Sequence, residues 1–338
     1  MRFLRLGIGT GLLIALSSLS WAAQSGSTIN GPSLGFVTNE NGTAIWPLLG
    51  ILGASVPGPA LVLPESIGHA AISPQQDYAL ALAGVRAEPV IVYLDASNPG
   101  VVPLTGGRPS ASLIAISPTG TAAALYQRES KFLQLVSGLP ANPQIAYEFD
   151  ASNLGGNIRD IAVSDDAKLA LVTVGDESRT LWVIDAKGIV TPVVAAQPSR
   201  MAFIAKRPDA LIADDASHEV FVLQGLDLNP VRLPGIVLRE DARPISAVIA
   251  SSDGQSIFVA QQDSEDITIT NVAARTTTVV SCHCKPTVFS PLKGVSLFRL
   301  NGLSHGPMMV LDASTSNPRT VIIPLDPDVF AGKGNEAP

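Results

Sequence analysis

The chain alternates short apolar runs with short polar segments, and the same grouping of runs returns roughly every 40 residues. In each unit an apolar run ends at Ser or another small residue, a tight turn follows, and a second apolar run returns. Ile161-Ala162-Val163-Ser164 and Val248-Ile249-Ala250-Ser251 are two examples of the first run. Apolar runs of this length between turn residues predict β-strands. Repeats made only of such strands predict a radial array of small sheets, a β-propeller.

Six complete units can be distinguished, and each begins with a predicted first strand. These first strands are expected at His69–Ser73, Ser112–Ser117, Arg159–Ser164, Arg200–Ala205, Ile245–Ser251 and Thr287–Ser290. Five of them end at Ser, and Ala205 fills the position in the fourth unit. The turns that follow, such as Ser117-Pro118-Thr119-Gly120, contain residues that favour tight turns.

A seventh unit is expected from the ends of the chain. Residues 34–38 and 43–48 form two apolar runs, and the Asn-Gly pair at Asn41-Gly42 between them is a strong hairpin signal. We expect this half-unit to complete a blade with strands near the other terminus, which would close the ring. The predicted fold class is therefore all-β, a β-propeller with seven blades of four-stranded sheets, while six or eight blades stay open.

The first residues have the composition of an export signal. Arg2 and Arg5 precede the apolar run Leu6–Leu19, and Ser20-Trp21-Ala22 provides small residues for cleavage after Ala22. The predicted organisation is a signal peptide at 1–22, one propeller domain at 23–325 and a loose polar tail at 326–338. This predicts a secreted or periplasmic protein, and no stretch after the signal is long and apolar enough to predict a membrane span.

Composition agrees with many short strands and argues against one class of partner. Charged residues make up only 15% of the chain, whereas it contains 29 Gly and 26 Pro. The formal net charge is −7, and it becomes more negative when Arg2 and Arg5 are removed. A nonspecific nucleic-acid binder usually has the opposite balance, so no nucleic-acid partner is expected.

The turn and strand Ser252-Asp253-Gly254-Gln255-Ser256-Ile257-Phe258-Val259 resembles the repeat of YVTN-type and lactonase-like propellers. Leu181-Trp182-Val183-Ile184-Asp185 is similar to the third strand of such a repeat. The resemblance extends over most of the chain after the signal, and it implies the propeller fold. It assigns no functional residue, because the chain contains no catalytic motif of a lactonase or a quinoprotein, and propellers host many roles.

Each link between predicted blades, or the first residue after it, carries a basic or titratable side chain. These residues are His69, Arg108, Arg159, Arg200, Arg243 and Lys285. Innermost strands begin there, so the side chains could ring the mouth of a central channel. Converging Arg side chains suit a carboxylate or phosphate ligand, because the guanidinium donates two aligned hydrogen bonds. Local ion pairing of each residue remains the alternative.

The turns between second and third strands are acidic in three consecutive units. They contain Asp176 and Glu177, then Asp214, Asp215 and Glu219, then Asp263, Glu265 and Asp266. An arc of carboxylates could bind a cation, for which Asp214, Asp215, Asp263 and Asp266 are weak candidates. Their spacing matches no defined calcium loop, and acidic residues are ordinary in exposed turns. No metal site or cofactor is therefore predicted.

Only two cysteines are present, Cys282 and Cys284, on either side of His283. A disulfide is the expected state of a lone cysteine pair in an exported protein. Free thiols, or a soft-metal site that uses both thiolates and His283, are the alternatives.

The favoured function is noncatalytic: a binding or interaction scaffold for a small anion, a glycan or a protein, with its site at the channel mouth. An enzyme of the lactonase or a related hydrolase class at the same face is the first alternative. A structural role in the cell envelope is the second. A buried carboxyl group with a perturbed pKa in the channel would favour the enzyme.

Overall fold

The computed structural model describes residues 31–95, 98–176, 179–193, 197–238, 244–303 and 306–325. The expected signal peptide at 1–22 and the tail at 326–338 lie outside these residues. The described chain contains one short 3₁₀ turn, η1 (Ala151–Leu154), and otherwise only strands and loops. No helix among the described residues is long and apolar enough to cross a membrane.

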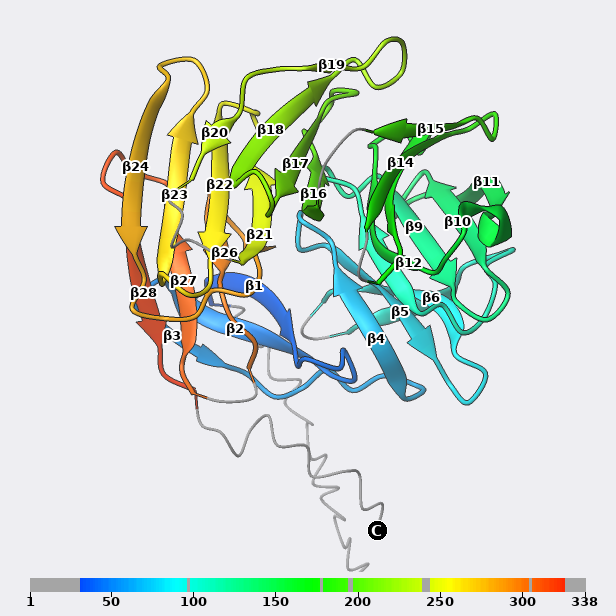
Figure 1. The fold of residues 1–338 in the computed structure, drawn as a ribbon. Helices are drawn as coiled ribbons and strands as arrows, with labels where there is room; N and C mark the ends of the chain where they lie inside the picture. Colours follow the sequence, from blue (N-terminus) through cyan, green and yellow to red (C-terminus); the bar gives the residue numbers. More distant parts are fainter. Residues whose placement is uncertain are drawn as a thin grey trace, which may run out of the picture. The chain divides into compact units, whose positions relative to one another are not determined.

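Seven antiparallel sheets follow one another along the described chain, and together they form a seven-bladed β-propeller (Figure 1). We number the sheets as blades 1 to 7 in chain order. Blade 1 consists of β1 (Ser33–Thr38), β2 (Ile45–Ile51) and β3 (Ala54–Pro57), and blade 2 of β4 (Ile67–Ile72), β5 (Tyr78–Ala83), β6 (Glu88–Tyr93) and β7 (Gly100–Pro103). Blade 3 consists of β8 (Leu113–Ile116), β9 (Ala122–Gln127), β10 (Phe132–Ser137) and β11 (Gln144–Asp150). Blade 4 consists of β12 (Ile158–Val163), β13 (Leu169–Val174), β14 (Thr180–Asp185) and β15 (Val190–Val193).

Blades 5 to 7 repeat this order with small variations. Blade 5 consists of β16 (Pro198–Phe203), β17 (Ala210–Asp214), β18 (Glu219–Gln224), β19 (Val231–Arg232) and β20 (Ile236–Val237). Blade 6 consists of β21 (Ile245–Ala250), β22 (Ser256–Gln261), β23 (Asp266–Asn271) and β24 (Thr276–Ser281). Blade 7 consists of β25 (Ser290–Pro291), β26 (Leu297–Arg299), β27 (Met308–Asp312) and β28 (Arg319–Ile323). In blade 5 both β19 and β20 pair with β18.

The first strand of each blade lies innermost. β12 contacts β8 on one side and β16 on the other, while β16 contacts β21, and β4 contacts β1 and β8. Figure 1 shows β12, β16 and β21 toward the middle and β24, β15 and β11 at the periphery. All six residues of β5 and β13 are buried, because neighbouring blades cover both faces of the second strands. β11 alternates between exposed and half-buried positions, as expected for an outer strand in contact with solvent.

Serine at the end of the first strand has a specific role in the turn that follows. The Ser164 hydroxyl accepts a hydrogen bond from the Leu169 backbone N–H at 3.0 Å and donates to Asp166 at 2.7 Å. Ser251 makes the same pair of bonds with Ser256 and Asp253, at 2.9 and 2.5 Å. The serine thus satisfies a backbone donor that the tight turn would otherwise leave without a partner.

Two of the predicted end positions are wrong. In blades 2 to 7 the residue that ends the first-strand motif donates its backbone N–H to the carbonyl of the residue five positions later. In blades 5 and 7 this donor is Ile204 and Leu292, respectively. The expected residues were Ala205 and Ser290. Where Ile or Leu replaces Ser, the chain has no polar residue to mark the position, so the sequence pattern shifts by one or two residues.

The predicted closure of the ring is also wrong. β1, β2 and β3 form a separate sheet, and β25 to β28 form another, so no blade combines strands from the two ends of the described chain. Apolar side chains close the seam instead: Trp46 and Leu48 of blade 1 pack in one cluster with Met308 and Val310 of blade 7. The Lys293 N–H also donates to the Leu34 carbonyl at 2.8 Å.

Gln76 and Arg299 complete this seam with polar contacts. The Gln76 side chain is 7% exposed. It accepts from the Phe36 N–H in blade 1 and donates to the Pro291 carbonyl in blade 7, both at 2.6 Å. Arg299 of blade 7 donates to the Thr38 carbonyl of blade 1 at 2.9 Å.

Candidate functional site

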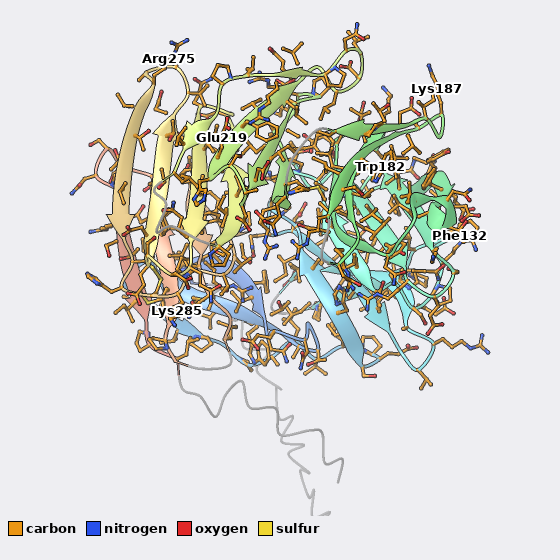
Figure 2. The ribbon with its side chains drawn as sticks, viewed as in Figure 1. Phe132, Trp182, Lys187, Glu219, Arg275 and Lys285 are labelled. Carbon is orange, nitrogen blue, oxygen red and sulfur yellow. A yellow bond between two sulfur atoms is a disulfide. The ribbon has the colours of Figure 1, made fainter. Side chains whose placement is uncertain are left out.

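Each blade has two ends, which carry different loops. In blade 6, Arg275 lies in the turn between β23 and β24, and Lys285 lies in the link that follows β24. Figure 2 shows these two residues at opposite ends of the blade. We call the end with the links and the second-to-third-strand turns the link face. The other end, with the first-to-second-strand and third-to-fourth-strand turns, is the hairpin face.

A pocket of about 440 Å³ lies at the link-face end of the innermost strands. Its charged wall contains Arg159 and Asp160 at the start of β12, Arg179 just before β14, and Arg200 in β16. Two predicted ligand-binding residues, Arg159 and Arg200, are therefore brought to one pocket. Arg179 and Asp160 join them.

Local backbone irregularities shape this wall. The register of β12 against β13 shifts between Ile158 and Asp160, so Arg159 is the extra residue of a bulge. Similar shifts occur in blade 5 around Ser199 and in blade 6 around Ser246. A bulge bends its strand and redirects a side chain, and here three successive innermost strands have one at the same end.

The three arginines differ in their contacts. Arg200 is held in place, because its Nε donates to the Ser246 carbonyl at 2.6 Å and its Nη1 donates to the Ser199 carbonyl at 2.8 Å. Arg159 forms an ion pair with Asp176. Within the described residues, Arg179 makes no hydrogen bond or ion pair, and it interacts with Asp160 through its charge alone. Arg179 therefore has the guanidinium most available to a ligand.

Asp160 is half-buried in the same wall, and its Oδ1 accepts from the Ile161 N–H at 2.9 Å. Burial raises the pKa of this carboxyl above its ordinary value, while Arg200, the backbone hydrogen bond and Arg179 act in the opposite direction. Loss of water destabilises the charged form more than the two arginines stabilise it. The pocket thus combines guanidinium donors with a carboxyl group that takes up a proton more readily than a solvated Asp.

The other predicted ring residues do not line this pocket. Arg108 donates to both carboxylate oxygens of Glu148, at 3.0 and 3.2 Å, and stacks over Phe132 at 4.2 Å from the ring centroid. Figure 2 shows Phe132 at the periphery. His69 donates its backbone N–H to the Asn41 carbonyl of blade 1, and burial lowers the pKa of its imidazole. Lys285 is exposed, and Arg243 lies outside the described residues.

The acidic arc is largely engaged with nearby groups. Asp214 accepts from the Gln197 and Ala216 N–H groups, both at 3.0 Å. Asp215 accepts from the Ile245 N–H at 3.2 Å. Asp263 lies in a turn and Asp266 begins β23, while Glu177 is outside the described residues. No three His, Cys, Asp or Glu side chains gather into a metal-binding group in the part of the chain that the structure describes.

A disulfide joins Cys282 and Cys284, whose Cα atoms are 5.0 Å apart. Cys282 is 1% exposed and packs with apolar side chains of blades 6 and 7. Two bonded sulfur atoms offer no thiolate to a soft metal ion.

A second, larger cavity of about 710 Å³ adjoins the arginine pocket. The two share wall residues, namely Met201, Val248, Val288 and Phe289. The larger cavity follows the axis of the propeller toward the hairpin face, and the innermost strands of all seven blades contribute to its wall.

The sequence analysis missed Arg179 and Asp160. Arg179 follows two acidic residues in the sequence, Asp176 and Glu177, so the local pattern is acidic and does not single out the arginine. The sequence does contain a signal for Arg179. Second-to-third-strand turns and inter-blade links share a face, so basic residues in both kinds of loop belong to one set of candidates. Asp160 follows Arg159 directly, and only the bulge at Arg159 explains why both line the pocket.

Comparisons with known proteins support the fold and leave the function open. No protein-family model and no curated protein matches the sequence. The chain is structurally similar to a protein of unknown function from Desulfotomaculum acetoxidans, with a TM-score of 0.56, 15% identity, and coverage of 86% of this chain and 100% of the other. Apo AztD from Citrobacter koseri gives a TM-score of 0.56 at 11% identity, with coverage of 86% and 82%. A candidate 6-phosphogluconolactonase from Bacteroides fragilis gives 0.56 at 11%, with coverage of 87% and 94%.

Proposed function

We propose that this protein is an exported, noncatalytic binding propeller that takes up a small anion at the link-face end of its axis. The observation that carries this proposal is the Arg179 guanidinium, which makes no hydrogen bond or ion pair within the described residues and lies in a pocket with Arg200. Arg200 is already oriented by two backbone carbonyls, so little conformational entropy is lost when it binds a ligand. Carboxylates, sulfates and phosphates match the donor geometry of such a pair.

Export is part of the proposal. The arginines and apolar run at residues 2–19 support it, and so does the Cys282–Cys284 disulfide, because disulfides persist in oxidising compartments.

The first test is sulfate binding measured by isothermal titration calorimetry. Arg179→Ala removes charge-assisted hydrogen bonds worth about 1.5–3 kcal/mol, so we expect the affinity for sulfate to fall roughly 10- to 100-fold. Arg275→Ala is the matched control, because it removes the same charge from the opposite end of a blade (Figure 2). Equal affinities in the two variants would contradict the proposed site.

Asp160 favours a second candidate function, a hydrolase of the lactonase type at the same pocket. A carboxyl group with a raised pKa in a partly enclosed pocket suits general acid–base catalysis, and the neighbouring guanidinium groups could stabilise a developing oxyanion. The structural similarity to the candidate 6-phosphogluconolactonase agrees with this alternative.

Asp160→Asn separates the two functions. For a binding protein, loss of the carboxylate charge beside Arg159, Arg179 and Arg200 should strengthen sulfate binding at neutral pH. In the wild type the affinity should rise as the pH falls through the raised pKa of Asp160, because protonation adds one positive charge to the pocket, whereas in Asp160→Asn the affinity should stay constant. Sulfate is suitable because its own charge does not change over this range.

A hydrolase would behave differently. Wild-type protein would release acid from glucono-δ-lactone at constant pH, and Asp160→Asn would abolish this turnover. Wild-type protein without turnover, together with tighter sulfate binding by Asp160→Asn, would support the binding function.

A further inference from the structure

We propose that the natural ligand is an amphipathic organic anion with a single apolar chain. Its acidic head group binds Arg179 and Arg200 at the link face, and its chain extends into the axial cavity. This inference rests on the proposed anion site and adds the chemical class of its ligand. The observation behind it is that the arginine pocket and the axial cavity share four wall residues and so lie directly beside one another.

The wall of the axial cavity is mixed, with somewhat more apolar than polar surface. Each innermost strand contributes two or three residues, and aliphatic or aromatic side chains dominate. They include Phe36, Ile72, Ile116, Ile161, Met201 and Val248. A cavity of about 710 Å³ lies within the range of roughly 300–1,000 Å³ that is usual for small-molecule sites. An apolar chain that displaces water from the aliphatic part of this wall is favoured, because it removes apolar surface from water.

The junction between the two spaces is itself apolar. Met201 follows Arg200 directly in β16, and Val248 lies two residues after Ser246, whose carbonyl holds Arg200. The change from charged donors to apolar residues therefore occurs within about two residues of strand, roughly 7 Å. A head group with an attached chain fits this change of polarity, whereas a free inorganic ion would leave the cavity unfilled.

The other charged group of the cavity does not provide a competing head-group site. Arg299 lines the cavity, but its Nη1 donates to the Thr38 carbonyl at 2.9 Å and its Nη2 to the Ser290 hydroxyl at 3.2 Å. Its Nε is enclosed by protein and has no partner among the described residues. Because these Arg299 donors are engaged at the seam between blades 7 and 1, the proposal places the acidic head group at the link face.

The test is a series of alkyl sulfates, methyl, butyl, hexyl and octyl, each titrated into the full-length protein below its micelle concentration. Burial of each methylene is worth about 0.8 kcal/mol, which corresponds to an affinity gain of about fourfold per methylene. We expect the affinity to rise along the series, and the heat-capacity change of binding to become more negative with chain length.

A substitution in the wall of the axial cavity provides an independent test. Ala202→Phe fills space beside Met201 outside the arginine pocket, so the ratio of octyl sulfate to sulfate affinity should fall at least about tenfold, the loss of two buried methylenes or more. Ala274→Phe, in the exposed turn between β23 and β24, is the matched control, and its ratio should equal that of the wild type. The alkyl sulfate titrations use wild-type protein, so they test the proposal even if Ala202→Phe fails to fold.

The possible outcomes separate this inference from the proposed function. If sulfate and methyl sulfate bind in an Arg179-dependent way, and affinity does not change with chain length, the amphipathic ligand is excluded and the anion site stands. If octyl sulfate binds tightly but independently of Arg179, the proposed anion site fails, and this inference fails with it. Arg179-dependent binding that strengthens with each methylene supports both.

Discussion

Gly42→Ala is expected to lower the free energy of unfolding by roughly 2–5 kcal/mol. Gly42 lies in the turn between β1 and β2 with a φ of 63°, a left-handed conformation that costs an L-residue about 1–2 kcal/mol. A Cβ atom at Gly42 would also lie 2.2 Å from the backbone nitrogen of Ala70 in blade 2. The neighbouring backbone would have to move, and such overpacking costs typically about 1–3 kcal/mol.

The position matters because this turn joins two blades. The carbonyls of Asn41 and Gly42 accept the backbone N–H groups of His69 and Ala70, both at 3.1 Å. A shift of the turn would weaken both hydrogen bonds. Urea unfolding followed by circular dichroism measures the effect.

Gly53→Ala is the control for this prediction. Gly53 has a φ of 85°, but among the described residues, its two chain neighbours aside, no heavy atom lies within 4 Å of a Cβ placed there. It should show only the backbone cost, about 1–2 kcal/mol. If the two variants lose equal stability, the close approach between blades 1 and 2 does not contribute as described.

Gln76→Leu is expected to lower the free energy of unfolding by about 2–6 kcal/mol, the second large effect. Leucine keeps most of the side-chain volume and removes both hydrogen bonds, so the Phe36 N–H and the Pro291 carbonyl lose their side-chain partner. Each buried group left without a partner costs about 1–3 kcal/mol. These two groups belong to blades 1 and 7, so the loss falls on the seam of the ring.

Gln75→Leu provides the comparison, because Gln75 is exposed in the same turn. It should change stability by less than about 0.5 kcal/mol. Hydrogen exchange offers a second measurement: Gln76→Leu should increase exchange in β1 and β26 more than in β13, which lies across the ring. Uniform acceleration throughout the molecule would argue against a local role at the seam.

The strand pattern in the sequence was sufficient to predict the propeller and its seven blades. Apolar runs such as Leu169–Val174 could be assigned as strands because neighbouring blades cover both of their faces. The end positions at Ile204 and Leu292 could not be found, since a backbone hydrogen bond defines them and no side chain marks them. Blade 1 was misassigned because sequence periodicity cannot show which sheet a terminal hairpin joins.

The candidate site was predictable only in part. Arg159 and Arg200 follow inter-blade links, and this rule correctly placed them on one face. The same rule failed for Arg108, because Glu148, on the outer strand β11, draws its guanidinium away from the axis. Such pairing depends on residues forty positions apart, which the local pattern does not reveal.

The self-contained sheet of blade 1 bears on how such a molecule can change over evolutionary time. Where a propeller weaves its first and last segments into a common sheet, gene duplication of one repeat must preserve that interwoven unit. Here every sheet in the described chain comes from one contiguous stretch of sequence. Duplication or deletion of a whole stretch would therefore leave the remaining sheets intact, and only the packing at Trp46, Gln76 and Arg299 would have to adapt to a new circumference.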